Sequence, residues 1–409
     1  MEVMTPRLSR RRALVAAAAA GLGLPAAATA TAAEPARRGG PFQSLRAATF
    51  NASLNRGREG QLLEDLATGK DAQIRAVAEV IQINSPDILL LNEFDHDDEG
   101  RGADLFREKY LEVPQNGQSP AFYPYAFTAP VNTGVPSGLD LNRDGAVEGP
   151  DDAWGFGQFP GQYGMVVLSR YPILTDQVRT FQNLRWADMP QNLLPTEFYG
   201  PEISPQLRLS SKSHWDVPVQ IGTDVLHVLA AHPTPPSFDG PEKRNQRRNH
   251  DEIRLWVDYL QPGRRSQWIV DDAGVRGGLD PSAPFVILGD LNSDPVDGDS
   301  WPGAIEQLLR HPRVQDPKPT SDGAVEAAET QGGANAGHGG EARYDTADFA
   351  EPTPGNLRVD YVLPARELQI VSSAVYWPRQ GEPGSELTGS HPFPTSDHRL
   401  VRVDLQVKA

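Results

Sequence analysis

Short, nearly continuous apolar runs recur along this chain, and a polar side chain follows most of them directly. The runs occupy residues 87–91, 165–169, 225–231 and 284–288. Apolar runs of this length are typical of strands that are buried on both faces of a sheet. The sequence therefore predicts four such strands. Further strands are expected over 45–50, 359–363, 371–377 and 400–407.

Two segments between these strands have the period of an amphipathic helix. Apolar residues recur at spacings of three and four from Ile74 to Ile81, ahead of Pro86. The same pattern occupies residues 244–260, ahead of Pro262. Helices among strands, with hairpin-like strands near the end, predict an α/β (α+β) protein in which two packed mixed sheets are flanked by helices. A simple doubly wound sheet is the alternative.

The first 33 residues have the order of an export signal. Arginines at 10–12 precede an alanine-rich run that reaches Pro25, and small residues continue to Ala33. This order resembles a twin-arginine signal and predicts export to a periplasmic or extracellular location. A membrane anchor or an alanine-rich helix is the alternative. No later run reaches the ~20 apolar residues of a membrane span, so no transmembrane segment is expected after the signal.

One domain is expected over residues 45–409, after a linker at 34–44. Two stretches within it resemble insertions. Residues 131–164 are rich in Gly, Pro and Asp, and residues 320–349 are rich in Gly, Ala, Asp and Thr without an apolar period. The second stretch is predicted to be a long, flexible surface loop.

Composition limits the chemistry that the chain can use. It has no cysteine, so a disulfide, a thiolate metal site and a cysteine nucleophile are excluded. The formal net charge of −16 argues against tight, nonspecific binding of polyanions. It does not exclude catalysis on a phosphoester, because a bound cation can invert the local field of an acidic site.

The polar residues at the strand ends are those that metal-assisted phosphoester hydrolysis needs. A divalent cation lowers the pKa of water and screens phosphoryl oxygens, and magnesium prefers oxygen ligands. Histidine can move a proton or contact the phosphate. In chain order, the candidates are Asn51, Glu93 in LLNEF, His232 after LAA, Asp290 and Asn292 in ILGDLNSDP, Asp360 in RVDYV, and Asp397 and His398 in SDHR.

Taken together, these motifs resemble the endonuclease/exonuclease/phosphatase superfamily, the group of DNase I-like nucleases, neutral sphingomyelinases and inositol phosphatases. The resemblance runs from about residue 45 to 407, and GDLN with SDH is its most specific part. It implies a four-layer sandwich of two mixed sheets between helices. It also implies Mg²⁺ or Mn²⁺ as cofactor, with Glu93 as the principal metal carboxylate, Asn51 beside it and Asp397 as a further ligand.

The same resemblance implies the catalytic roles. Asp290 positions or deprotonates the attacking water, and Asn292 orients the phosphoryl group. His398 contacts the scissile phosphate or accepts a proton, with Asp360 orienting its far nitrogen. His232 resembles a second histidine of the DNase I and sphingomyelinase branches. Those nucleases orient it with a glutamate, whereas the corresponding neighbourhood here is GQYG at 161–164, so its orienting residue stays open.

The expected function is therefore an exported, metal-dependent phosphodiesterase or nuclease. A phosphomonoesterase or a sphingomyelinase-like lipid phosphodiesterase is the alternative, and a noncatalytic calcium-binding module is a third. The substrate would be a nucleic acid, a nucleotide or a phospholipid headgroup, with no obligate protein partner evident. A nucleophilic serine is disfavoured because no GxSxG occurs.

A second metal loop is predicted within the first insertion. Oxygen ligands at Asp140, Asn142 and Asp144, the backbone of Ala146 and an acid at Asp151 follow the calcium-loop spacing of EF-hand and dockerin modules. The final acid is shorter than the usual glutamate, and the neighbouring prolines argue against flanking helices. Weak, structural Ca²⁺ binding is expected, and a solvated turn is the alternative.

Overall fold

The computed structural model describes residues 42–408, so the predicted export signal lies outside the described residues. Within the described part, no helix is both long and apolar enough to cross a bilayer. The first strand, β1 (Phe42–Leu54), begins inside the predicted linker, so the folded region starts at least three residues before residue 45.

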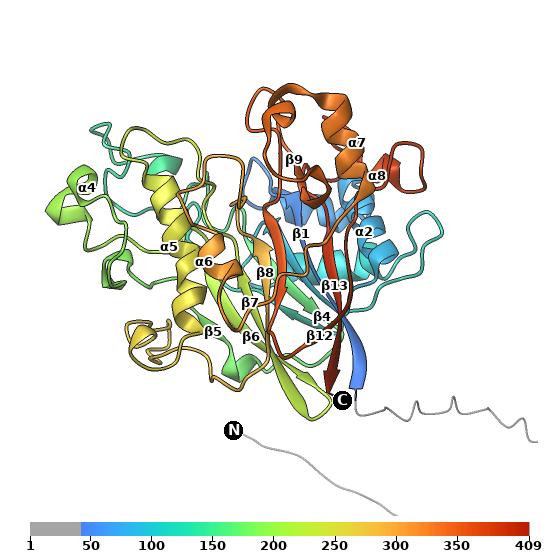
Figure 1. Ribbon diagram of the computed structural model, residues 1–409, viewed down its shortest axis with the longest axis horizontal. Coiled ribbons are helices and arrows are strands. Elements are labelled where there is room, and N and C mark those ends of the chain that lie inside the picture. Colours follow the sequence, from blue (N-terminus) through green and yellow to red (C-terminus); the bar gives the residue numbers. More distant parts are fainter. Residues whose placement is uncertain (1–41, 409) are drawn as a thin grey trace, which may run out of the picture. The chain divides into compact units, whose positions relative to one another are not determined.

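Two mixed sheets form the centre of the fold (Figure 1). The first has six strands in the order β12 (Gln369–Val375), β13 (Val401–Lys408), β1, β2 (Ile88–Phe94), β4 (Met165–Ser169) and β3 (Tyr125–Phe127). The second has five, in the order β11 (Asp360–Pro364), β8 (Phe285–Asp290), β7 (Asp224–Ala231), β6 (His214–Ile221) and β5 (Arg179–Thr180). Only β1 with β2 and β7 with β8 pair in parallel among these strands. The expectation of two mixed sheets is confirmed, and the doubly wound alternative is wrong.

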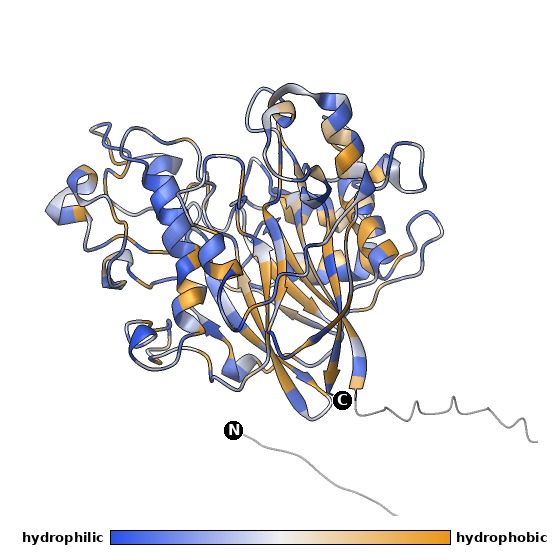
Figure 2. Cartoon of the chain, in the orientation of Figure 1, coloured by the Kyte–Doolittle hydropathy of each residue, from blue (hydrophilic) through white to orange (hydrophobic). Residues whose placement is uncertain are grey.

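The sheets pack face to face through a shared apolar layer. Leu45, Ile88 and Val403 of the first sheet join Trp215 and Val286 of the second in one buried cluster. Two further clusters cover the outer faces, where helices pack. Figure 2 shows mostly orange, apolar strands at the centre of the fold, whereas α5 is blue along most of its length. The fold is therefore the expected four-layer sandwich.

Helices cover both outer faces. The helices on the first sheet are α1 (Gln61–Thr68), α2 (Ala72–Asn84) and α3 (Arg101–Phe106), and those on the second are α4 (Thr196–Ile203), α5 (Arg244–Tyr259) and α6 (Glu306–Leu309). The short turns are η1 (Arg107–Leu111), η2 (Pro150–Asp152), η3 (Thr175–Gln177), η4 (Trp186–Asp188) and η5 (Gly263–Arg265). The predicted helices correspond to α2 and α5.

Residues 320–349, which were expected to form a long, flexible surface loop, contain regular secondary structure. This stretch holds α7 (Asp322–Gln331), η6 (Gly333–Gly337), η7 (Ala342–Tyr344) and β9 (Ala347–Asp348), which pairs with β10 (Asn356–Leu357). The side chain of Ser321 caps α7, and Gly323 donates its N–H to the Trp377 carbonyl, where a Cβ would lie 2.2 Å from that oxygen. The helix buries alanine rather than large apolar residues, so its period was weak in the sequence. The last helix, α8 (Ser385–Thr388), precedes β13.

Candidate active site

Parallel strand ends bring four of the predicted residues to one edge of the sandwich. Asn51 lies in β1 and Glu93 in β2, with Asn51 in register with Asn92. Asp290 ends β8, and His232 directly follows the neighbouring parallel strand β7. The carboxyl ends of parallel neighbours share an edge, so the two sheets each contribute a pair of polar side chains.

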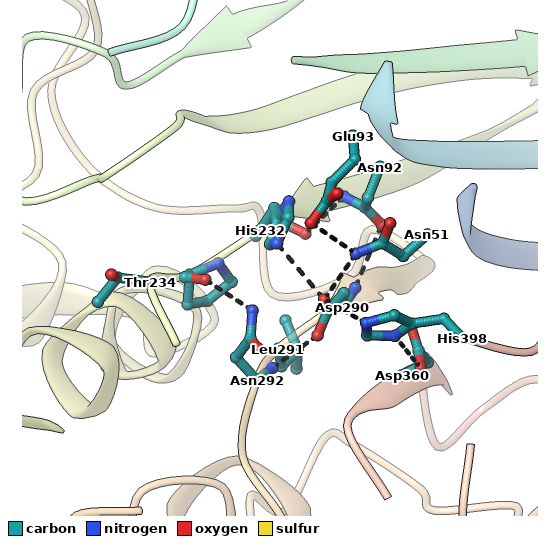
Figure 3. A network of polar contacts seen from close by, with 12 residues as sticks. Asn51, Asn92, Glu93, His232, Thr234, Asp290, Leu291, Asn292, Asp360 and His398 are labelled. Atoms are coloured by element: carbon teal, nitrogen blue, oxygen red, sulfur yellow. Dashed lines mark hydrogen bonds and ion pairs between the residues drawn. The ribbon is translucent and has the colours of Figure 1, made fainter. Parts of the chain in front are cut away.

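Two more of the predicted residues come from antiparallel strands and the turn before one of them. Asp360 begins β11 and stands opposite Asp290 in the β8–β11 pairing. His398 precedes β13, whose residue Val401 pairs with Thr49 of β1. All the residues assigned to catalysis, and also Asn51 and Glu93, therefore converge on one site (Figure 3).

Asn51 links the carboxylates of the two sheets. Its amide nitrogen lies 3.1 Å from Glu93 Oε1 and 3.0 Å from Asp290 Oδ2. The second oxygen of Glu93 accepts a hydrogen bond of 2.7 Å from Asn55. Asn92 accepts the Asp290 backbone N–H at 3.2 Å. The sequence motifs assigned no role to Asn55, which follows no predicted strand end, or to Asn92, although Asn92 directly follows the predicted strand at 87–91 within LLNEF.

Asp290 is the hub of the site. Its Oδ2 atom lies 3.4 Å from His232 Nε2 and 3.7 Å from His398 Nε2. Its Oδ1 atom accepts the backbone N–H of Asn292, whose own side chain donates to the Pro233 carbonyl. The Asp290 side chain is 1% exposed, so these contacts act in a medium with little water.

A histidine–aspartate pair lies next to Asp290. His398 Nδ1 lies 2.9 Å from Asp360 Oδ2, which leaves Nε2 directed toward Asp290. The Thr346 hydroxyl donates to the same Asp360 oxygen at 2.8 Å and accepts the backbone N–H groups of Val359 and Asp360. Thr346 is thus a positioning residue for the pair, and sequence analysis missed it because it lies in the stretch that was predicted to be a loop.

Neighbouring charges shift the pKa values of the site residues in different directions. Burial raises the pKa of Asp290, but the imidazoles of His398 and His232 and the amide of Asn51 outweigh burial and lower it below its usual range. Burial raises the pKa of Asp360 to about 6. Burial lowers the pKa of His398, but the carboxylates of Asp360 and Asp290 raise it well above its usual value. Asp290 is therefore ionised and His398 is an imidazolium at neutral pH.

The pKa of His232 shifts downward, in the direction opposite to that of His398. Burial lowers its pKa, and the neighbouring Lys212 lowers it further. Its Nδ1 atom has no hydrogen-bond partner among the described residues. Of the segment at 161–164, Gln162 donates to the Arg56 carbonyl and Tyr163 donates its N–H to Asp95. That segment therefore does not supply the orienting group for His232.

Glu93 and Asn292 have left-handed backbone conformations, with φ of 58° and 51°. Non-glycine residues adopt this region at a cost, and such residues are frequent at functional sites. In both cases the strained residue carries a side chain that faces the site (Figure 3).

The donors around Glu93 suit a divalent cation that prefers oxygen ligands. Glu93 is half-buried, and Asn51 donates a hydrogen bond both to Glu93 and to Asp290. Asp290, Asp360 and His398 also bring ligand atoms within 4.8 Å of one another, but His398 Nδ1 already contacts Asp360. Asp397 lies beside Ser53 and Ser396, at 3.4 Å from each hydroxyl, and no contact joins it to Glu93 within the described chain. Glu93 with Asn51 is therefore the better candidate metal position.

The predicted calcium loop is closed by its own hydrogen bonds. Asp140 accepts the N–H groups of Asp144 and Gly145, and Asn142 accepts that of Asp144. At the end of the loop, the side chain of Asp152 accepts the N–H groups of Leu141 and Glu148. Asp151 instead lies 4.0 Å from Arg244. Calcium binding stays a prediction, with Asp152 as the acid that folds back onto the loop.

Comparisons with known proteins agree with the fold. The family described as the Endonuclease/Exonuclease/phosphatase family matches residues 48–398, a span that holds the whole site. Among solved structures, an endonuclease/exonuclease/phosphatase from Beutenbergia cavernae is 18% identical, with a TM-score of 0.50 over 90% of this chain and 72% of that chain. A search of curated proteins finds no match.

Two other similar structures have lower TM-scores. TDP2 from C. elegans is 16% identical, with a TM-score of 0.43 over 89% of this chain and 75% of that one. Sphingomyelinase C from Streptomyces griseocarneus is 14% identical, with a TM-score of 0.43 over 88% of this chain and 99% of that one.

Proposed function

Because the chain belongs to the endonuclease/exonuclease/phosphatase family, whose members hydrolyse phosphoesters, we propose that it is an exported phosphodiesterase that requires Mg²⁺ or Mn²⁺. The observation that carries the proposal is the position of Asp290. Its carboxylate contacts His232, His398 and Asn51, and Asn51 also contacts Glu93. A water-orienting carboxylate, two imidazoles and a metal carboxylate thus share one buried network.

Each residue has a role that fits its protonation state. Ionised Asp290 orients the attacking water and accepts its proton. The His398 imidazolium, held by Asp360, donates a hydrogen bond to a phosphoryl oxygen and neutralises charge as the ester bond breaks. Asn292 orients the phosphoryl group, and neutral His232 donates or accepts one further hydrogen bond. Glu93 and Asn51 would hold the cation, which supplies screening of the phosphoryl charge when bound.

An acidic cavity beside the site favours a small substrate over a long nucleic acid. It has a volume of about 360 Å³, and its lining includes the acids Glu59, Asp97, Asp98 and Glu99 besides Arg101, and it reaches Asp95, two residues from Glu93. Negative side chains repel the phosphates that flank the scissile bond in a polynucleotide. This observation supports the second candidate, a sphingomyelinase-like phosphodiesterase that acts on a headgroup.

The proposal of export depends on the N-terminal sequence alone. The arginines at 10–12, the alanine-rich run and the small residues up to Ala33 support it. Expression of the full chain with the arginines at 10 and 11 changed to lysine, followed by fractionation, tests the route. Equal export of both forms would contradict the twin-arginine pathway.

An activity screen tests the proposed reaction and chooses its substrate. The protein is assayed with Mg²⁺ and with a chelator against bis(p-nitrophenyl) phosphate, p-nitrophenyl phosphate, plasmid DNA, RNA and sphingomyelin. We expect chelator-sensitive hydrolysis of the diester, with sphingomyelin preferred over plasmid DNA. Cleavage of the monoester alone would replace the phosphodiesterase by a phosphatase, and no cleavage of any substrate would contradict the proposal.

A further inference from the structure

Lys212 is a buried cation at the edge of the site that the sequence motifs did not mark. Its side chain is only 7% exposed. Burial and the charge of Arg248 lower the pKa of Lys212, whereas the carboxylates of Glu252, Glu93 and Asp290 raise it. Lys212 in turn acts on His232. A lysine ammonium has three donors, and a ligand that enters the site can supply acceptors for them.

The strand register places Lys212 next to the reacting groups. His214 begins β6 and pairs with Ala231, the last residue of β7. The chain that enters β6 therefore runs beside the chain that leaves β7 toward His232. Because β6 is antiparallel to β7, residues that precede it lie at the same edge as residues that follow β7.

Helix α5 fixes the backbone that carries Lys212. Arg248 donates to the carbonyls of Arg208, Leu209 and Ser210, and four residues later Glu252 accepts the N–H and hydroxyl of Ser211. On the other side, the Asn132 N–H donates to the Lys212 carbonyl. Contacts on every residue from 208 to 212 leave the segment little freedom to move.

Glu252 also fixes the turn after His232. Its second oxygen accepts the Thr234 N–H at 2.7 Å, while its first holds Ser211. One buried carboxylate therefore sets the position of the Lys212 segment relative to the His232 turn. Such a connection keeps two ligand-facing groups at a constant separation.

The carboxylates near Lys212 do not depend on it alone. Glu252 already accepts three hydrogen bonds, and Arg248 is its strongest charged neighbour. Burial still raises the pKa of Glu252, and Lys212 is one of several groups that oppose this shift. Glu93 and Asp290 also have amide or imidazole partners of their own. The positive charge of Lys212 is left for the anion that enters the site.

We propose that the Lys212 ammonium binds a phosphoryl oxygen of the substrate beside His232, and that Glu252 is the residue that positions it. The inference rests on the proposed phosphodiesterase function. Lysine is a common phosphate-binding residue because its compact charge tolerates several oxygen positions. The developing negative charge of the transition state would strengthen the contact.

Binding of inorganic phosphate and hydrolysis of bis(p-nitrophenyl) phosphate test Lys212 separately. Both are measured in Mg²⁺ buffer for the parent, Lys212→Met, Lys212→Arg and Lys70→Met, the last being an exposed lysine that controls for the change of net charge. We expect Lys212→Met to weaken phosphate binding at least ~10-fold and to lower kcat/KM by ~10²-fold, with partial recovery in Lys212→Arg and no change in Lys70→Met. Lys212→Gln replaces Lys212→Met if the latter does not fold.

The two readouts separate failure of the inference from failure of the proposed function. Hydrolysis by the parent, with phosphate binding and kcat/KM within twofold in Lys212→Met, would overturn the role of Lys212 and leave the function standing. Phosphate binding that depends on Lys212 in a parent that hydrolyses no ester would support the anion contact and overturn the function. A parent that does neither would overturn both.

A double-mutant cycle tests the positioning role of Glu252. Glu252→Gln should weaken phosphate binding less than Lys212→Met does, and it should add no further loss when both changes are combined. Fully additive losses in phosphate affinity would show that Glu252 acts independently of Lys212. Thermal unfolding of each variant separates these effects from general destabilisation.

Discussion

Asp360 and Asp290 stand opposite one another in the β8–β11 pairing, yet their pKa values shift in opposite directions. Asp290 is surrounded by His398, His232 and Asn51, whereas one oxygen of Asp360 has no partner in the described chain. The His398 ring lies between the two carboxylates, 2.9 Å from one and 3.7 Å from the other. This arrangement keeps the imidazole charged and its Nε2–H available to the substrate.

Asp360→Asn should shift the alkaline limb of the pH–rate profile to lower pH. The Asp360 carboxylate is the strongest group that raises the pKa of His398, so its loss lets the imidazolium deprotonate earlier as the pH rises. We expect kcat/KM near neutral pH to fall by ~10²-fold. The check is kcat/KM between pH 5 and 10, with Asp224→Asn, an exposed carboxylate at the start of β7, as the control. An unmoved alkaline limb would exclude this role of the pair.

Thr346→Val should destabilise the fold and reduce activity together. The hydroxyl accepts two backbone N–H groups and donates to Asp360, so valine leaves buried donors without a partner. A loss of ~1–3 kcal/mol in the free energy of unfolding is expected. Thr346→Ser should recover most of both properties. Denaturant unfolding and kcat report the result, with the exposed Thr330→Val as the control, and wild-type values in Thr346→Val would refute it.

Asn55→Ala should raise the Mg²⁺ concentration that gives half-maximal activity by ~10–100-fold, because the amide holds one oxygen of Glu93. Activity at saturating Mg²⁺ should stay close to that of the parent. Asn116→Ala is a matched control, since Asn116 makes the same amide–carboxylate contact with Glu79. A Mg²⁺ titration distinguishes the two, and identical curves would remove Asn55 from the metal position.

The calcium-loop prediction is tested by calorimetric titration. The parent should bind Ca²⁺ with a Kd on the order of 10⁻⁴ to 10⁻³ M, as extracellular calcium modules do. Asp140→Ala combined with Asp144→Ala should abolish the heat, because both carboxylates lie within the loop. Calcium heat that is unchanged in the double variant would leave the loop as a solvated turn.

The sequence was sufficient to predict those strands and helices that show a clear apolar pattern. Strands β4 and β8 are buried along their length, β2 is buried except at Glu93, and β7 is buried over its last four residues, so their apolar runs and polar ends stood out. Strand β6 was missed because Pro218 interrupts it. The Pro218 carbonyl pairs with the Leu174 N–H beyond the end of the short neighbour β5, and proline is tolerated there.

Most of the site was predicted where a polar residue follows a strand, and Asp360 and His398 were predicted from family motifs. Lys212 precedes an antiparallel strand, so a search of carboxyl ends passes over it. Thr346 acts through Asp360 and lies in a segment without an apolar period. Asn55 follows β1 by one residue, but nothing in the sequence shows that the chain turns back toward Glu93. Such contacts depend on how distant loops pack, which local patterns do not encode.

The most direct test of the account compares the parent with Asp290→Ala and His398→Ala in Mg²⁺-dependent hydrolysis of bis(p-nitrophenyl) phosphate. Circular dichroism and thermal unfolding confirm that each variant is folded. The account predicts chelator-sensitive hydrolysis by the parent and a loss of at least ~10³-fold in kcat for each variant. Parental activity in both folded variants would contradict the assignment of the site.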